Sequence, residues 1–221
     1  MIIANNKWGY INIFGRFYSL IFYIVTLLII VLEKQKINIA IFASGRGSNA
    51  QKIIDHFNKS NGKGKVVLIV TNNPNAGVIK IAENENIKSL VIERKIFYED
   101  GYLDVLKRDS INLIVLAGFM WMVPPQIIRS FPNKIVNIHP ALLPKFGGKK
   151  MYGNFVHEAV INAKEKESGI TIHYVDEIYD NGKIIFQATC TVDENESAET
   201  LANKIHVLEH EHYPKIIESL L

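Results

Sequence analysis

The stretch INIAIFASGRGSN, residues 37–49, joins a continuous apolar run to a glycine-rich turn. The run over residues 37–43 is short, rich in isoleucine and apolar on both faces, which is typical of a strand buried inside a sheet. After the turn, apolar residues recur at helical spacing within residues 50–57. A buried strand that leads directly into a helix is the repeating unit of parallel α/β sheets. The stretch therefore predicts an α/β domain that starts near residue 36.

The same alternation continues toward the C-terminus. Further strands are expected at residues 66–71, 89–92, 113–117 and 135–138, and further helices at residues 79–86 and 98–108. Two later runs, over residues 170–175 and 183–189, indicate an antiparallel pair, and Ser197 is a suitable N-cap for a last amphipathic helix. We therefore predict an α/β fold with a doubly wound, mostly parallel sheet, helices on both faces and an antiparallel C-terminal strand region.

The composition is that of an ordinary globular protein. The chain has 221 residues, of which 48% are hydrophobic and 21% charged, so it is long enough to bury a core. The net charge is +3 with no basic block, which gives no indication of a nucleic-acid partner. Cys190 is the only cysteine, which excludes an internal disulfide and a cysteine-based zinc site. We expect Cys190 to be a core residue and the protein to be cytoplasmic.

The first 35 residues differ from the rest. Residues 17–32 are apolar and carry no charge. As a helix they would span about 24 Å, against roughly 30 Å of bilayer hydrocarbon. We interpret residues 1–35 as an apolar extension outside a domain at residues 36–221, with few contacts to it, and expect its deletion to leave catalysis almost unchanged. A membrane anchor at residues 17–32 is a less favoured alternative, and a signal sequence lacks a cleavage site.

The strongest chemical signal is VNIHPALLP, residues 136–144. Asn137 and His139 stand two apart at the end of an apolar run, so a strand would project both side chains to one side before Pro140 ends the ladder. An amide donor beside a titratable ring suits a reaction that passes through a tetrahedral oxyanion. No serine or cysteine nucleophile accompanies the pair, so the attacking group would belong to a substrate. An isolated pair of this kind more often caps a strand, and the assignment depends on the rest of the chain.

The glycine-rich turn, residues 45–49, is a candidate phosphate loop. Glycines let a backbone approach a ligand closely, and the free amides at a helix start attract an anion. The loop lacks the Lys-Ser/Thr of a P-loop and the third glycine of a dinucleotide fingerprint, which favours a single phosphate monoester over ATP or NAD. The alternative is a simple strand-to-helix turn. Because ligands bind at the carboxyl ends of strands in doubly wound sheets, this loop and the Asn137/His139 pair can face one cleft.

Two further loops follow strands. In the loop over residues 176–182, Asp180 can orient His139, raise its pKa or carry a proton, although a solvated carboxylate is the more common case on spacing alone. The segment over residues 117–125 places bulky apolar groups after a strand, where they can form the wall of a pocket for a flat heteroaromatic ligand or simply face the core.

Three histidines need an interpretation of their own. His173 lies inside an expected strand and is expected to pack or to face solvent. His206 and His210 have the i, i+4 spacing that can bind a metal on a helix, but no third ligand of evident role accompanies them. We therefore predict no metal site.

Four motifs occur in the same order and spacing as in a known family: IFASGRGSN at residues 41–49, LAGFM at residues 116–120, NIHPALLPKF at residues 137–146 and DNG at residues 180–182. In these motifs the chain closely resembles the phosphoribosylglycinamide formyltransferases, also called glycinamide ribonucleotide transformylases, of the folate-dependent formyltransferase family. The resemblance extends over residues 36–221. The motif N-x-H-P-x-L-L-P is shared by all folate-dependent formyltransferases. The loop S-G-x-G-S-N narrows the resemblance to the phosphoribosylglycinamide formyltransferases.

The resemblance implies transfer of a formyl group from 10-formyltetrahydrofolate to the amine of glycinamide ribonucleotide, in de novo purine biosynthesis and without a metal. It implies the following roles: catalysis for Asn137, His139 and Asp180; substrate binding for Gly47, Ser48, Asn49 and Glu209; folate binding for Phe119, Met120, Trp121, Met122, Val123, Asp176 and Glu177. We expect small-molecule substrates only, and a monomer or weak homodimer.

The chain also departs from the family pattern. Trp121 stands where many members carry a basic residue, the segment over residues 147–153 replaces an expected histidine-containing segment, and residues 1–35 have no counterpart. Three alternatives stay open. A methionyl-tRNA formyltransferase would need a C-terminal RNA-binding domain. A formyltetrahydrofolate hydrolase would need an N-terminal regulatory domain. A membrane-tethered, non-catalytic relative would have no need of an intact catalytic set.

Overall fold

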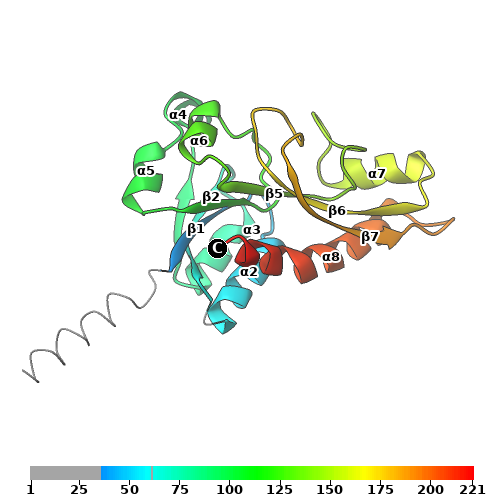
Figure 1. The fold of residues 1–221 in the computed structure, drawn as a ribbon, viewed down its shortest axis with the longest axis horizontal. Coiled ribbons are helices and arrows are strands. Elements are labelled where there is room, and N and C mark those ends of the chain that lie inside the picture. Colours follow the sequence, from blue (N-terminus) through cyan, green and yellow to red (C-terminus); the bar gives the residue numbers. More distant parts are fainter. Residues whose placement is uncertain (1–35, 61) are drawn as a thin grey trace, which may run out of the picture. The chain divides into compact units, whose positions relative to one another are not determined.

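Residues 36–60 and 62–221 are described by the structure, a computed structural model (Figure 1). The predictions for residues 1–35, including the apolar helix over residues 17–32, lie outside the described residues. In the part that is described, no helix is long and apolar enough to cross a membrane. The boundary between extension and catalytic domain stays a prediction.

The described residues form one seven-stranded sheet with the order β3-β2-β1-β4-β5-β6-β7. Its strands are β1 (Ile37–Phe42), β2 (Gly64–Thr71), β3 (Lys88–Val91), β4 (Leu113–Leu116), β5 (Ile135–His139), β6 (Glu167–Tyr174) and β7 (Ile184–Thr191). Strands β1 to β5 pair in parallel, whereas β6 runs antiparallel to β5 and β7 antiparallel to β6. The predicted, mostly parallel sheet with an antiparallel C-terminal region is confirmed.

Helices cover both faces of the sheet, as predicted. They are α2 (Ser48–Lys59), α3 (Gly77–Asn84), α4 (Arg94–Glu99), α5 (Leu103–Arg108), α6 (Pro125–Ser130), α7 (Asn154–Asn162) and α8 (Ala198–Ser219). Helices α2, α3 and α8 lie on one side of the sheet, and α4, α5 and α6 on the other (Figure 1). Alternate residues of β1 serve the two layers: Ile39 and Ile41 belong to one core, and Ala40 and Phe42 to the other. Burial on both faces explains the continuous apolar run.

One helical prediction needed correction, and two helices were not predicted. The single helix expected at residues 98–108 is two short helices, because Gly101 adopts a left-handed φ of 68° and its amide returns to the Ile96 carbonyl at 3.2 Å, which ends α4. Helix α6 was not predicted, since it has only six residues and begins at a Pro-Pro pair. Helix α7 was also missed. The last helix was predicted correctly: Ser197 caps α8 in a capping box with Thr200.

The strand order reverses between β1 and β4, which opens a crevice at their carboxyl ends. Two hydrogen bonds hold the loops after these strands together. The Ser44 amide donates to the Gly118 carbonyl at 3.1 Å, and the Met120 amide donates to the Ser44 hydroxyl at 2.8 Å. The candidate phosphate loop and the candidate apolar wall are therefore neighbours.

Candidate active site

A cavity of about 460 Å³ lies at this carboxyl edge of the sheet. The predicted site residues that line it are Gly47, Ser48, Asn49, Phe119, Met120, Trp121, Met122, Val123, Asn137, His139, Asp176, Asp180 and Glu209. Glu177 alone among the predicted residues does not line it, and its carboxylate instead accepts a hydrogen bond from Arg129 at 3.4 Å. One cavity thus brings together segments that lie more than 100 residues apart in sequence.

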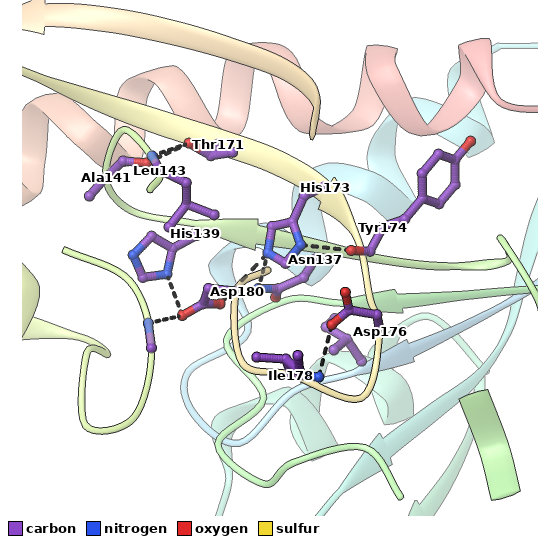
Figure 2. A network of polar contacts seen from close by, with 12 residues as sticks. Asn137, His139, Ala141, Leu143, Thr171, His173, Tyr174, Asp176, Ile178 and Asp180 are labelled. Atoms are coloured by element: carbon purple, nitrogen blue, oxygen red, sulfur yellow. Dashed lines mark hydrogen bonds and ion pairs between the residues drawn. The ribbon is translucent and has the colours of Figure 1, made fainter. Parts of the chain in front are cut away.

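Asn137 owes its orientation to His173, which is buried directly across the antiparallel ladder. Figure 2 shows the His173 ring beside the Asn137 amide, with the other ring nitrogen turned to the Tyr174 carbonyl. Nδ1 must carry a proton to donate to that carbonyl, at 2.8 Å. In the neutral ring Nε2 is then an acceptor, and it takes a hydrogen bond from Nδ2 of Asn137 at 3.1 Å. This contact leaves the second amide hydrogen of Asn137 free for a ligand.

His139 is only 3% exposed at the end of β5. Its Nε2 donates to the Phe146 carbonyl at 2.8 Å, so the lone pair of the neutral ring is on Nδ1. Nδ1 lies 3.5 Å from Oδ2 of Asp180 (Figure 2). Burial lowers the pKa of His139 and outweighs the charge of Asp180, which raises it. The expected influence of Asp180 is present, but the ring stays neutral near pH 7 in the free protein.

Asp180 is held as a carboxylate between two imidazole rings. Its Oδ2 accepts the Gly148 amide at 2.9 Å, and its Oδ1 lies 3.7 Å from Nε2 of His173. Burial raises the pKa of Asp180, but the opposing influences outweigh burial and lower it; with both imidazoles in the neutral tautomers assigned above, the Gly148 amide is the hydrogen-bond donor among them. Asp180 is therefore ionised at neutral pH, and it can stabilise a proton that arrives on His139.

The glycine-rich loop opens α2, and Gly47 occupies the N-cap position with a left-handed φ of 82°. The structure gives a packing reason for a glycine here, beside the expected close approach of a ligand, which stays a prediction. A Cβ at Gly47 would lie 2.8 Å from Val78 Cγ2 and 2.9 Å from Ile81 Cδ1, so it would meet the side chains of α3. At Gly45, which also lines the cavity, a Cβ would meet nothing within 4 Å.

Glu209 lies beside this loop and is 5% exposed. Its Oε2 accepts from Nδ2 of Asn49 at 2.9 Å and contacts Nδ1 of His206 at 3.0 Å. The hydrogen bond to Glu209 raises the pKa of His206. One turn along α8, the buried Tyr213 hydroxyl lies 2.9 Å from the Leu116 carbonyl and 3.2 Å from that of Val136, which fixes α8 against the sheet. The end of the cavity beside the candidate phosphate loop therefore carries a carboxylate and an imidazole that are joined by a short contact.

The wall of the cavity next to this loop carries the aromatic side chains of Phe119 and Trp121. Phe119 packs edge-on against Phe42, with ring centroids 5.3 Å apart. Trp121 lies beside Phe97 and Tyr98, at 5.8 and 6.3 Å between centroids. The Arg94 guanidinium stands 5.7 Å from the Trp121 ring centroid and 5.8 Å from that of Tyr98. Flat rings with a cation at their margin can hold a heteroaromatic ligand that carries an anionic group.

Sequence reasoning missed several lining residues. His173 was expected only to pack or face solvent, and the cross-strand register with Asn137 is the signal that would have found it. The segment over residues 148–153 lines the cavity with two lysines in place of the expected histidine. His157, four residues later on α7, brings a buried histidine to the cavity instead.

The remaining candidates are the His206/His210 pair and Cys190. The rings of His206 and His210 stack at 6.1 Å, and among residues 36–60 and 62–221 no three His, Cys, Asp or Glu side chains are grouped so that they could hold a metal ion. Cys190 is partly buried against the core, and burial raises the pKa of its thiol.

The polar groups on the cavity floor can together promote acyl transfer to a substrate nucleophile. The Asn137 amide offers a donor for an oxyanion, Nδ1 of His139 offers a base, and Asp180 offers a negative charge that stabilises the protonated ring. No step of such a transfer requires a nucleophile from the protein.

Comparison with known proteins gives relatives over most of the chain. A family model described as formyl transferase matches residues 37–217. The chloroplastic phosphoribosylglycinamide formyltransferase of Arabidopsis thaliana is 38% identical over 194 residues, which are 85% of this chain and 66% of the relative. The Bacillus subtilis phosphoribosylglycinamide formyltransferase is 38% identical over 187 residues, which are 82% of this chain and 93% of the relative.

Solved structures show the same similarity. The crystal structure of glycinamide ribonucleotide transformylase 1 from Geobacillus kaustophilus matches with a TM-score of 0.78 and 37% identity, over 84% of this chain and 99% of that one. The chain thus spans about two thirds of the plant relative and nearly all of the two bacterial proteins.

Proposed function

The chain belongs to the formyl transferase family, and from this premise we propose that it transfers the formyl group of 10-formyltetrahydrofolate to the amine of glycinamide ribonucleotide, in de novo purine biosynthesis. The observation that supports this most directly is the convergence of Asn137, His139 and Asp180 on one cavity. That cavity has a helix start suited to a phosphate and an aromatic wall beside it. Relatives named for this reaction match the chain at 37–38% identity.

The reaction begins when the neutral amine of the acceptor attacks the formyl carbon of the donor. A C–N bond forms, and the carbonyl electron pair moves to oxygen as an oxyanion. The free Nδ2 hydrogen of Asn137 donates to this oxyanion, and such a donor typically contributes about 10²–10³ in rate. The amine proton passes to Nδ1 of His139, directly or through one water.

The protonated His139 ring is then stabilised by the Asp180 carboxylate 3.5 Å away. Collapse of the tetrahedral intermediate breaks the bond between the formyl carbon and N10 of the folate. The proton on His139 passes to N10, so the products are the formylated acceptor and tetrahydrofolate, and the protein returns to its starting state. His173 keeps the Asn137 amide aimed at the oxyanion throughout.

For the acceptor, we assign the phosphate to the amides of Gly47, Ser48 and Asn49 at the start of α2. Glu209, which Asn49 and His206 hold in place, would contact the ribonucleotide next to this phosphate. The loop has neither the lysine of a P-loop nor a third glycine, which again favours a monoester.

For the donor, the wall from Phe119 to Val123 would hold the folate, with Asp176 on the facing loop. Trp121 stands where many family members have a basic residue, so this chain has no positive charge at that position. The Arg94 guanidinium lies beside the Trp121 and Tyr98 rings and supplies a cation nearby. Among residues 36–60 and 62–221 it forms no ion pair. We assign Arg94 to the anionic glutamate tail of the donor. Glu177 faces Arg129 and stays the weakest of the predicted folate contacts.

The test is formyl transfer by the full chain from 10-formyltetrahydrofolate to glycinamide ribonucleotide, followed by mass spectrometry of the acceptor and by absorbance of the released tetrahydrofolate. We expect the acceptor to gain one formyl group for each donor consumed. Release of formate instead would identify a hydrolase. Formylation of methionyl-tRNA alone would identify the tRNA enzyme, and neither product would identify a non-catalytic relative. The Asn137→Ala variant is the control for background transfer.

We further propose a cytoplasmic location, which the single cysteine supports. We also propose that the protein acts on small-molecule substrates, that it holds no resident metal, and that it is a monomer or a weak homodimer. Light scattering across a concentration series would measure the oligomeric state. Membrane fractionation of the full chain would test whether residues 17–32 bind a bilayer.

A further inference from the structure

His157 is a cavity residue that the mechanism above does not use. It lies on α7 and is 3% exposed, yet it lines the cavity. Its Nδ1 is buried and has no hydrogen-bond partner in the described part of the chain, whereas Nε2 is not among the atoms closed off in this way. A buried polar group without a partner is costly, and a native protein rarely keeps one without a use.

The protonation of the ring follows from its surroundings. Burial is the main influence and lowers the pKa of His157, so the ring is neutral near pH 7. A neutral imidazole carries one N–H, and an unpaired N–H costs more when it is closed off than when it is open to a cavity. The proton therefore belongs on Nε2, and His157 presents a hydrogen-bond donor to the cavity.

Among the groups that influence the pKa of His157, the Glu209 carboxylate comes next after burial, and it raises that pKa. The Glu209 carboxylate can only accept hydrogen bonds. His157 and Glu209 line the same cavity, so a neutral donor and a carboxylate acceptor are both open to one ligand. Of the acceptor's functional groups, a phosphate or a carbonyl only accepts and an amide N–H only donates. A hydroxyl can accept from His157 and donate to Glu209 at the same time.

We propose that His157 and Glu209 together bind a ribose hydroxyl of the acceptor, so that His157 is a specificity-determining residue for a ribonucleotide. The proposal rests on the proposed function, because it takes a ribonucleotide as the substrate. Nothing in the formyl-transfer steps needs His157, so its contribution is to acceptor binding and not to the chemical step.

Three variants test the role of the Nε2 donor. His157→Phe keeps a flat ring without nitrogen, His157→Gln places an amide nitrogen near the position of Nε2, and His157→Asn places one near Nδ1. We expect His157→Phe and His157→Asn to raise KM for glycinamide ribonucleotide about tenfold, the equivalent of one hydrogen bond. His157→Gln should stay within about threefold of the wild type on the same scale. KM for the folate donor and kcat should change little in all three.

The matched control is His210→Phe. His210 also has a buried nitrogen without a partner in the described chain, namely Nε2, but it does not line the cavity. Its substitution should leave both KM values unchanged. If His210→Phe raises KM for the acceptor as much as His157→Phe does, the effect is general to packing around α8 and the proposal is wrong.

Acceptor analogues that lack the 2′- or the 3′-hydroxyl identify the bound group. For one of them, wild type and His157→Phe should have the same KM, because the hydrogen bond is already absent. If His157→Phe raises KM by the same factor for both analogues and for the natural acceptor, the proposal is wrong. If the His157→Phe protein does not fold, the comparison of His157→Gln with His157→Asn decides, together with the ¹⁵N shift of Nε2 in the wild type on addition of acceptor.

The failures can be told apart. A wild-type protein that does not formylate glycinamide ribonucleotide refutes the proposed function. A wild-type protein that does so, with KM for the acceptor unaffected by His157→Phe, refutes only the role of His157.

Discussion

Substitution of Gly47 by alanine should destabilise the fold, and only secondarily affect the ligand. Gly47 has a φ of 82°, a conformation that costs a residue with a Cβ about 1–2 kcal/mol. The new Cβ would also lie 2.8 Å from Val78 Cγ2 and 2.9 Å from both Val78 Cβ and Ile81 Cδ1. Overpacking of this kind costs about 1–3 kcal/mol. The two effects together lower the free energy of unfolding by about 2–5 kcal/mol, out of roughly 5–15 for a typical domain.

Thermal and urea denaturation of the free protein measure this loss. For a chain of this size each kcal/mol corresponds to about 2–4 °C, so Tm should fall by about 4–20 °C. Gly45→Ala is the matched control, since its Cβ would meet nothing within 4 Å in the same loop. Its Tm should stay close to that of the wild type.

Calorimetric titration with glycinamide ribonucleotide separates two explanations for the glycine. If Gly47 were needed to admit the phosphate, Gly47→Ala would keep the wild-type Tm and lose acceptor affinity. Equal Tm values for Gly47→Ala and Gly45→Ala would refute the packing argument.

The other predictions concern the catalytic groups and the donor site. Asn137→Ala and His139→Ala should each lower kcat by about 10²–10³, while circular dichroism should show that both variants stay folded. Near-normal kcat in either variant would refute the mechanism. Because burial lowers the pKa of His139 in the free protein, kcat/KM corrected for the ionisation of the acceptor's amine should be constant above neutral pH and fall on acidification with a midpoint below 6.5. The Asp180 charge raises this pKa, so Asp180→Asn should move the midpoint to lower pH, and a shift to higher pH would contradict the stabilisation of the protonated ring by Asp180. The free energy of unfolding should also decrease on acidification. As the pH falls, the unfolded chain protonates at His139 before the folded chain does. The stability that comes from the neutral, buried ring is therefore complete above about pH 6.5 and is lost as the pH falls toward the pKa of His139 in the folded protein. Arg94→Ala should raise KM for the folate donor about threefold to tenfold and spare KM for the acceptor; an equal rise in both would indicate a structural effect instead.

Local sequence rules determined the parts of this protein whose partners are close in the chain. The apolar runs and the turns between them predicted the parallel strands and the antiparallel pair, because the side-chain periods of strands and helices depend only on neighbouring residues. The same period placed Asn137 and His139 on one face at a strand end. The capping of α8 by Ser197 was equally local, since the cap reaches only three residues ahead. The family motifs then identified the carboxylate of Asp180.

Contacts between distant segments needed the tertiary structure. His173 meets Asn137 because of the register between β5 and β6, and a shift of one residue would turn it to the other face. The requirement for glycine at position 47 comes from Val78 on another helix. The neutral state of His139 depends on a balance between burial and the charge of Asp180, and no spacing in the sequence reveals which is larger. Strand register, helix packing and desolvation are properties of groups brought together in space, so only the folded chain decides them.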